Sequence, residues 1–333
     1  MPKVYIVLLN FNGTLDTIEC LESLLKLAYK NVQIIVVDNS PSSTPFENLI
    51  NWGKGLTNEV ETQFDELVYP LSPKPLLYKA LSEDELSSNT HTEKILFIKA
   101  NQNKGFAAGN NIALRYIQQC NIKTNPFIWV LNNDTVVVKN ALSNQIKCFN
   151  SKENIGILGS KLINYNDPGK IQALGGSFNN TFYITQHICE GEPVHHEISE
   201  NLKIDYVIGA SMFMNLDFIN EVGLMDENFF LYFEETDWAF RAKAKDYKVD
   251  VCLNAIVYHK EGKSIGSSYD FKNRSFFSEK ILFISRKRFI KKHFKLSFKF
   301  YFSSLLLFSN RIRRGQFKIA FELLKITFLK QIV

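Results

Sequence analysis

Two apolar segments of the sequence end in a carboxylate. Asp38 closes the run Val32–Val37, and Asp134 follows Phe127–Leu131 after two asparagines. If both runs are parallel strands of one sheet, these acids lie at the edge outside which α/β proteins bind their ligands. Carboxylate oxygens there suit Mg²⁺ or Mn²⁺, whose remaining ligands are commonly substrate phosphates. Either acid alone could equally cap a helix or form a turn; the pair, with a glycine-containing loop between them, favours a phosphate-bearing ligand.

A second acidic group lies later in the chain, where Glu234, Glu235 and Asp237 fall within four residues between Phe233 and Trp238. Crowded carboxylates raise one another's pKa, which suits a general base that works near neutral pH. Aromatic neighbours suit the face of a sugar. The alternative is that the acids only favour the positive end of a helix dipole.

The elements that must position these groups alternate between strand and helix. Expected strands are Val4–Leu9, Val32–Val37, Ile95–Lys99 and Phe127–Leu131, with helices after Thr14 and over Ile112–Gln119. Continuous apolar runs of this length are typical of parallel strands buried on both faces. The pattern predicts an α/β fold with a Rossmann-like, mostly parallel sheet flanked by helices.

The domain organisation follows from composition along the 333 residues. We expect one catalytic domain over residues 1–265, with a surface insertion over about 41–93 where Pro, Ser, Asn and charged residues dominate. Residues 266–333 are expected to form a basic helical extension. From Glu279 onward there are 14 Lys and Arg against two acids, a net +12, which leaves −7 for the rest of a chain of net charge +5.

The basic extension mixes its cations with apolar residues. Arg286, Lys287 and Arg288 stand among phenylalanines and isoleucines, a pattern of helices that lie on anionic lipid. The alternative is a helix that packs its apolar face on the catalytic domain. No nucleic-acid motif is present, so a nucleic-acid partner is not expected.

Location is predicted from cysteines and hydropathy. The five cysteines are scattered and form no CxxC pair, which indicates a reducing compartment. No apolar run reaches the roughly 18 residues that a membrane-spanning helix needs, and the N-terminus does not resemble a signal peptide. We therefore expect a cytoplasmic protein, peripheral on the inner face of the cell membrane.

An ordered series of motifs resembles one enzyme family. The sequence contains V-D-N-S, N-K-G-F-A-A-G-N-N, W-V-L-N-N-D-T, F-L-Y-F-E-E-T-D-W and Y-H-K-E-G between Val4 and Gly262. This series is similar to that of inverting family 2 glycosyltransferases, nearest the bacterial rhamnosyltransferase and galactofuranosyltransferase branch. The resemblance implies an A-type glycosyltransferase fold, a nucleoside-diphosphate sugar donor and a divalent metal, Mg²⁺ or Mn²⁺.

The resemblance also implies roles for individual residues. Asp134 and His259 would bind the metal, and Glu235 would be the general base, with Asp237 and Glu234 as the other acids of the catalytic group. Residues implied in binding the nucleotide sugar are Asn10, Asn12, Asp38, Asn103, Lys104, Gly105, Asn132 and Asn133. Gly209, Ala210 and Trp238 would lie beside the donor sugar and the acceptor. Asn132 stands where the family usually has an acid, which leaves Asp134 as the carboxylate of its motif.

The predicted function is transfer of a sugar from dTDP-rhamnose or a UDP-sugar to a lipid-linked or oligosaccharide acceptor, as in the synthesis of O-antigen or capsule polysaccharide. A homodimer is left open. One alternative is a nucleotidyltransferase that makes sugar nucleotides, although N-F-N-G-T-L-D lacks the basic Gly-rich loop expected after its first strand. Another is a non-catalytic sugar- or lipid-binding module with a decayed metal site, suggested by Asn132.

Overall fold

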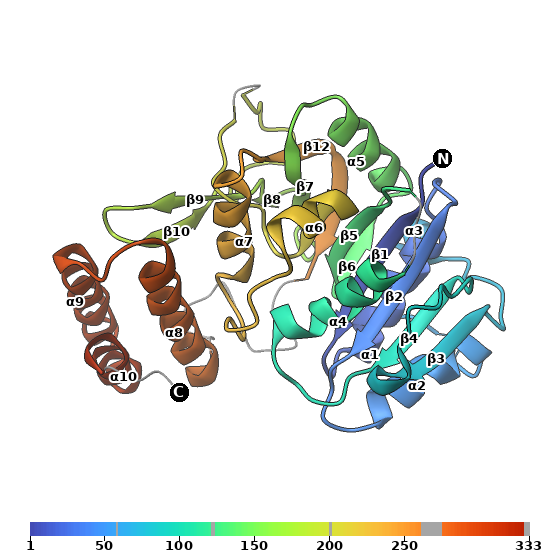
Figure 1. Ribbon diagram of the computed structural model, residues 1–333, viewed down its shortest axis with the longest axis horizontal. Helices are drawn as coiled ribbons and strands as arrows, with labels where there is room; N and C mark the ends of the chain where they lie inside the picture. The colour runs from blue at the N-terminus through green and yellow to red at the C-terminus, as the bar shows by residue number, and fades with distance from the viewer. Residues whose placement is uncertain (58, 121–123, 200–201, 261–274, 330–333) are drawn as a thin grey trace.

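The computed structural model describes residues 1–57, 59–120, 124–199, 202–260 and 275–329. Figure 1 shows a body built on a large twisted sheet, with a group of three C-terminal helices beside it. A hairpin of two strands extends from the sheet towards these helices.

The main sheet has ten strands in the order β3-β4-β2-β1-β5-β11-β7-β12-β6, with β8 paired to β7. The strands are β1 (Val4–Asn10), β2 (Val32–Asp38), β3 (Tyr78–Ser82), β4 (Ile95–Lys99), β5 (Phe127–Asn132), β6 (Thr135–Val137), β7 (Ile155–Asn164), β8 (Ile171–Ala173), β11 (Ser211–Asn215) and β12 (Lys248–His259). Strands β9 (Gly176–Asn179) and β10 (Ile184–His187) form the separate hairpin.

The N-terminal half of the sheet is parallel, as the sequence predicts. Strand β1 pairs in parallel with β2 and with β5, and β2 pairs in parallel with β4. Along β1, Val4, Ile6 and Leu8 enter the core on one face of the sheet and Tyr5 and Val7 enter the core on the other. The strand reads as continuously apolar because both of its faces are buried.

Helices cover both faces of this sheet. Those of the body are α1 (Thr14–Leu25), α2 (Thr44–Lys54), α3 (Asp65–Val68), α4 (Phe106–Gln119), α5 (Ala141–Asn150), α6 (Leu216–Val222) and α7 (Glu234–Lys243), with a 3₁₀ turn η1 (Glu83–Glu85). Helices α1, α2, α3 and α5 pack on one face, and α4, α6 and α7 pack on the other. The expected α/β architecture, a mostly parallel sheet flanked by helices, is confirmed.

The segment expected as a surface insertion over 41–93 is more than that. It contributes β3, which pairs in parallel with β4 at the edge of the sheet. It also places Trp52 of α2, fully buried, in the main core. The polar composition misled the prediction because short elements leave much of the segment in loops, yet its few large apolar residues are internal.

Three helices form the C-terminal group: α8 (Phe276–His293), α9 (Phe298–Arg313) and α10 (Phe317–Phe328). The extension is helical as expected, while the predicted boundary at residue 265 lies outside the described residues. None of the helices in the described part of the chain has the length and hydropathy of a membrane-spanning segment.

Two cations of α8, Arg286 and Lys287, are internal, which corrects the expectation that they face lipid. Arg286 is buried and donates to the carbonyls of Tyr183 and Phe182 and to two serines of α9. Lys287 is buried and donates to the carbonyls of Ile326 and Thr327 at the end of α10. These hydrogen bonds satisfy helix-end carbonyls that would otherwise lack partners, so the alternative of a packed helix holds for α8.

Candidate active site

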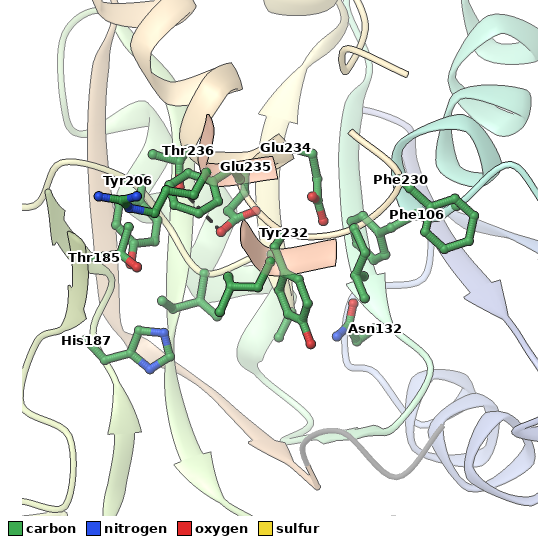
Figure 2. Close-up of a pocket in the computed structure, with 18 of the residues that line it drawn as sticks. Phe106, Asn132, Thr185, His187, Tyr206, Phe230, Tyr232, Glu234, Glu235 and Thr236 are labelled. Atoms are coloured by element: carbon green, nitrogen blue, oxygen red, sulfur yellow. Dashed lines mark hydrogen bonds between the residues drawn. The ribbon is translucent and has the colours of Figure 1, made fainter. Parts of the chain in front are cut away.

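A cavity of about 760 Å³ lies at the carboxyl ends of β1, β2 and β5. Figure 2 shows side chains from the loop before α7, the start of α7, the hairpin and the end of β5 facing into it. Predicted site residues that line it are Asn103, Gly105, Asn132, Asn133, Asp134, Gly209, Ala210, Glu234, Glu235 and His259. The fold thus gathers residues from five separate sequence motifs at one place.

Asp134 and His259 lie against each other in this cavity. Asp134 is in the turn between β5 and β6, and His259 ends β12, which pairs with β6 so that His259 is opposite Thr135. The Asp134 Oδ1 to His259 Nε2 distance is 3.2 Å, and both side chains are buried. Burial would raise the pKa of Asp134, but His259 and then Lys260 outweigh it, and that pKa stays below its ordinary value.

The polar surroundings of His259 orient its ring. Its Nδ1 lies 2.8 Å from Oε1 of Gln172, an amide oxygen that only accepts, so Nδ1 carries the proton. Nε2 then faces Asp134 and, at 3.4 Å, Nδ2 of Asn132. A hydrogen bond from the far ring nitrogen to an oxygen is the usual support of a metal-binding histidine.

These residues fit a divalent cation. Neighbouring ligands of an octahedral Mg²⁺ lie about 3 Å apart, close to the Asp134–His259 separation. Oδ1 of Asn132 is buried and has no hydrogen-bond partner among the residues that the structure describes. Nowhere in the described ranges do three or more His, Cys, Asp or Glu side chains gather as a metal cluster, so a cation here would need further ligands from a substrate such as a diphosphate.

Glu234 and Glu235 begin α7 and enter the cavity from the side of β12 and β7. Glu235 is half-buried and lies beside Gly209. A Cβ added to Gly209 would lie 3.9 Å from the Cβ of Glu235. Burial raises the pKa of Glu235 to about 7, although backbone and Thr236 hydrogen bonds work against the rise. Burial and the neighbouring Glu235 charge raise the pKa of Glu234 well above its ordinary value. Both environments favour the neutral form of the Glu234 carboxyl, and near neutral pH Glu235 is poised between its two forms.

The loop that leads into α7 is strained. Tyr232 and Phe233 both have positive φ, 67° and 68°, a backbone conformation that costs of order 1–3 kcal/mol for such residues. Both side chains line the cavity. Strained residues of this kind concentrate at ligand sites, where the surrounding structure holds them in place.

Gly105 is required by this same loop. Its φ is +93°, and a Cβ there would lie 2.1 Å from the carbonyl oxygen of Phe230. The neighbouring amide of Phe106 donates to that oxygen at 2.7 Å. The resemblance implies Gly105 in binding the nucleotide sugar; the backbone that approaches Gly105 in the structure is that of Phe230.

Two predicted nucleotide contacts, Asn10 and Asp38, lie in a network behind the cavity, and Asn133 connects this network to the cavity lining. Asp38 is fully buried and accepts from Nδ2 of Asn10 and from Nζ of Lys99, both at 2.5 Å. Oδ1 of Asn10 accepts from the hydroxyl of Thr17 at 2.9 Å, and Asn133 donates to the same hydroxyl at 2.8 Å. This network fixes the turn after β1 against the turn after β5.

The remaining loop residues divide between cavity and solvent. Asn12 and Lys104 are exposed and lie outside the cavity lining. Asn39, which the sequence reasoning passed over in favour of its neighbour Asp38, does line it. Nδ2 of Asn39 donates to Oδ1 of Asn103 at 2.8 Å, and its own buried Oδ1 has no partner in the described residues. The sequence signal that could have identified Asn39 as a site residue is its position directly after Asp38, the acid that ends β2.

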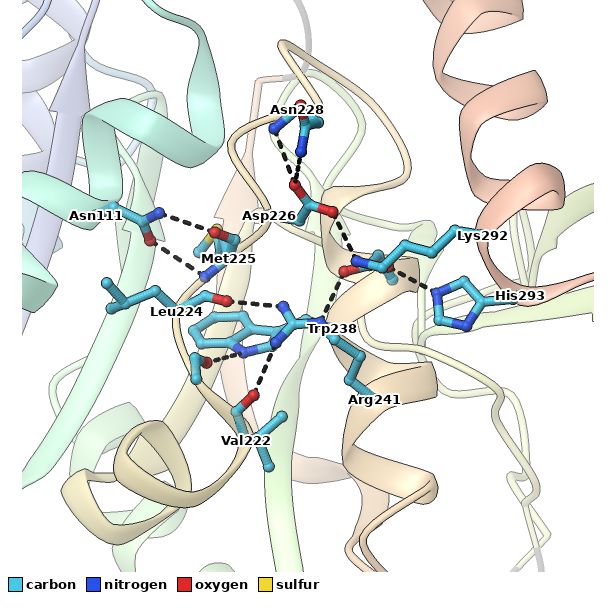
Figure 3. Close-up of polar contacts among 12 residues, drawn as sticks. Asn111, Val222, Leu224, Met225, Asp226, Asn228, Trp238, Arg241, Lys292 and His293 are labelled. Atoms are coloured by element: carbon cyan, nitrogen blue, oxygen red, sulfur yellow. Dashed lines mark hydrogen bonds and ion pairs between the residues drawn. The ribbon is translucent and has the colours of Figure 1, made fainter.

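Asp237 and Trp238 lie on the other side of α7 from the cavity. Asp237 is fully buried and pairs with Arg241 at 2.8 Å, Lys292 at 2.7 Å and His293 at 2.6 Å. Figure 3 shows Lys292 and His293 reaching from α8 to α7 at this point. Burial would raise the pKa of Asp237, but the hydrogen bonds from His293 and Lys292 and the charge of Arg241 hold it below its ordinary value.

The environment of Trp238 likewise does not support the sugar-facing role expected for it. Its side chain is fully buried in the core, and its indole N–H donates to the carbonyl of Gly223. The Phe and Tyr rings that do line the cavity are Phe11, Phe106, Tyr183, Tyr206, Phe230, Tyr232, Phe233, Phe277 and Phe283.

One wall of the cavity was not predicted at all. Residues Tyr183–His187 of the hairpin line it, and so do Phe277, Leu282, Phe283 and Arg286 of α8. Arg286 joins these two parts through its hydrogen bond to the Tyr183 carbonyl, 2.9 Å. The sequence marks this hairpin only as a turn at Gly175-Gly176-Ser177, and contacts between segments a hundred residues apart leave no local pattern.

Comparison with solved structures places this geometry in a known fold. The mannosyltransferase PcManGT of Pyrobaculum calidifontis, solved with GDP-Man and Mn²⁺, matches all of this chain and 76% of its own, with a TM-score of 0.52 and 12% identity. The chain has the A-type glycosyltransferase fold. S. aureus TarS in complex with UDP-GlcNAc is also similar, with a TM-score of 0.50 and 13% identity over 98% of this chain and 81% of its own.

A curated sequence relative was also found. The low-salt glycan biosynthesis hexosyltransferase Agl10 of Haloferax volcanii is 24% identical over 209 residues, which are 60% of this chain. The matched region spans 65% of that relative, slightly less than two thirds of its length. No family model matches the chain.

Proposed function

We propose that this protein is an inverting, metal-dependent hexosyltransferase. It would move a sugar from a nucleoside-diphosphate donor to a hydroxyl of a lipid-linked or polysaccharide acceptor in cell-surface glycan synthesis. The observation that carries the proposal is that the Asp134–His259 pair and Glu235, whose pKa is about 7, face the same cavity. The fold and the hexosyltransferase relative support it.

The proposed reaction is a single displacement at the anomeric carbon. The acceptor oxygen bonds to that carbon as the bond to the diphosphate oxygen breaks, and the acceptor proton passes to the carboxylate of Glu235. Attack opposite the leaving group inverts the configuration. Burial and the charge of Glu235 raise the pKa of Glu234 and so favour its neutral form, which would limit the negative charge near the anomeric centre.

Charge on the leaving group needs compensation. A Mg²⁺ or Mn²⁺ held by Asp134 and His259 would neutralise the departing diphosphate. The carbonyl oxygen of Asn132 is available as a further ligand or as a partner for the donor ribose, which accounts for an amide in place of the usual acid. Asn39, Asn103 and Gly105 would contact the nucleotide, since they line the same end of the cavity.

Donor and location complete the proposal. dTDP-rhamnose and UDP-sugars are the donors we favour from the motif series, and a GDP-sugar belongs in the same panel because PcManGT was solved with GDP-Man. A lipid-linked acceptor would bring the enzyme to the inner face of the cell membrane as a peripheral protein.

A donor panel tests the proposed function directly. Purified protein is incubated with each nucleotide sugar in the presence of Mn²⁺ or Mg²⁺, and release of the nucleoside diphosphate is measured with and without acceptor. We expect metal-dependent release with one donor, abolished by EDTA and by Asp134→Ala. Nucleotide binding without turnover for every donor would instead favour the non-catalytic module.

A further inference from the structure

The pair of helices α9 and α10 exposes large apolar side chains. On α9 these are Phe298, Phe302, Leu305 and Leu306, and on α10 and just after it they are Phe317, Phe321, Phe328 and Leu329. Each is at least 44% exposed, and Phe298 is 81% exposed. Soluble surfaces carry isolated apolar residues routinely, but a set of eight on two adjacent helices indicates an interaction surface.

These side chains form one surface. On α9 they recur three or four positions apart, with Leu306 beside Leu305, and on α10 they recur four and then seven positions apart, which places them on one side of each helix. Aromatic contacts join the helices, with the rings of Tyr301 and Phe328 stacked 5.5 Å apart and those of Phe308 and Phe321 6.0 Å apart. We call these eight residues, with Tyr301 and Phe308, the apolar strip.

The opposite sides of both helices are already covered. Phe300, Ser303 and Ser304 of α9 are buried, as are Ile319 and Leu323 of α10. The apolar strip is therefore not the face by which these helices join the protein.

Cations surround the apolar strip. Lys295, Lys299, Arg313, Arg314, Lys318 and Lys325 are all exposed. The one acid within the two helices is Glu322, which pairs with Lys280 of α8 at 2.9 Å and with Lys325 at 3.9 Å. Unlike Arg286 and Lys287, Lys295, Lys299 and Lys325 are exposed and can meet an external partner of negative charge.

The apolar strip adjoins the active-site cavity. Phe277 of α8 lines the cavity and is 52% exposed. Its neighbour Phe276 lies under the ammonium group of Lys318, 4.5 Å from the ring centroid, at the start of α10. A partner bound to α10 would therefore lie close to the rim of the cavity.

We propose that the apolar strip and its surrounding cations dock on an anionic lipid bilayer. The phenylalanines and leucines would enter the boundary between headgroups and acyl chains, while Lys and Arg remain at the level of the lipid phosphates. A second copy of the chain is disfavoured because pairing the strip with itself would bring like charges together. The proposal deepens the proposed function, since it would present the cavity to a lipid-linked acceptor, but membrane binding itself does not depend on sugar transfer.

Vesicle co-sedimentation of the full chain tests the apolar part. Wild type is expected to pellet with vesicles that contain phosphatidylglycerol and to bind pure phosphatidylcholine much more weakly. Phe302→Ser with Phe321→Ser should weaken binding about tenfold or more. The matched control is Leu56→Ser with Leu77→Ser, which removes two similarly exposed leucines from the body, 71% and 69% exposed, and should leave binding unchanged.

A second pair of variants tests the charge. Lys299→Gln with Lys325→Gln should weaken binding to anionic vesicles and reduce its dependence on salt, whereas Lys54→Gln with Lys79→Gln on the body should not. Thermal unfolding of each variant checks that the fold is kept.

Three results would overturn the proposal: no binding of wild type to anionic vesicles, equal losses in test and control pairs, or a wild-type dimer that Phe302→Ser with Phe321→Ser dissociates without any vesicle binding. Glu235→Gln, expected to be inactive, should bind vesicles like wild type. Failure of the proposed transfer activity and failure of membrane docking are thus separate outcomes.

Discussion

Replacing Glu235 with glutamine should remove the general base while keeping the shape of the site. Glu235 is half-buried in the cavity wall, and the substitution changes one oxygen to an amide. General-base catalysis contributes about 10²- to 10⁴-fold, so we expect kcat to fall by that factor, which corresponds to about 3–5 kcal/mol of the activation free energy. Donor binding, measured by calorimetry with Mn²⁺, should change little.

The pH dependence makes this prediction specific. With a pKa of about 7, Glu235 is ionised in about one molecule in ten at pH 6, so kcat/KM should fall about tenfold there from its alkaline plateau. A carboxylate with an ordinary pKa of 4.5 would show no such loss. Glu235→Gln should lack this limb of the profile.

Glu234→Gln is the matched control. Burial and the charge of Glu235 raise the pKa of Glu234 and favour its neutral form, so a neutral amide should reduce kcat by less than about tenfold and keep the limb near pH 7. If Glu235→Gln retains more than a tenth of wild-type kcat, or retains the pH limb, the assignment of the base is wrong.

The same carboxylate should also affect stability. Its folded-state pKa lies above that of the unfolded chain, so the unfolded chain loses the proton first, and the free energy of unfolding falls as pH rises from about 4.5 to 7. Glu235→Gln should therefore raise Tm at pH 8 and leave it nearly unchanged at pH 4. The gain has an upper bound of roughly 3 kcal/mol from the size of the shift and should be smaller because the side chain is partly solvated. Equal Tm values at pH 8 would contradict the raised pKa.

Three further substitutions address other parts of the site. Asp134→Asn should weaken Mn²⁺-dependent donor binding at least about tenfold by calorimetry and leave metal-free binding unchanged; loss of both would indicate misfolding. Gly105→Ala should cost about 2–4 kcal/mol in urea unfolding, since its Cβ would collide with the Phe230 carbonyl, and a neutral result would contradict the described loop. Asp237→Asn should lower the free energy of unfolding by about 3–5 kcal/mol, because Arg241, Lys292 and His293 lose a buried carboxylate partner. A normal Tm with kcat lowered as for Glu235→Gln would make Asp237 the base.

The local parts of this site could be predicted from sequence. Asp134 follows strand β5, His259 ends strand β12 and Glu235 lies in the first turn of α7, and the fold brings all three to the cavity. The direction of a side chain was harder to predict. Asp38 and Asn39 are adjacent, yet Asp38 is held by Asn10 and Lys99 behind the site while Asn39 enters it.

In the basic extension, too, the sequence did not predict which side chains are buried. Its composition predicted helices and cations correctly, but composition does not distinguish a lysine that meets lipid from one that caps another helix. Lys287 is buried against the end of α10, and Lys299, twelve residues on, is exposed. The packing of α8 between the body and α10 is what buries Lys287 and leaves Lys299 exposed.

The wall that α8 adds to the cavity has a consequence for biosynthesis. Every strand of the sheet and every proposed catalytic residue precede α8 in the chain, and domains form largely in the order in which they leave the ribosome. The nascent body can assemble its sheet and its acidic residues while Phe277, Phe283 and Arg286 are still unmade. The protein would then become able to catalyse the reaction in one late step, when α8 packs against Asp237 and the hairpin.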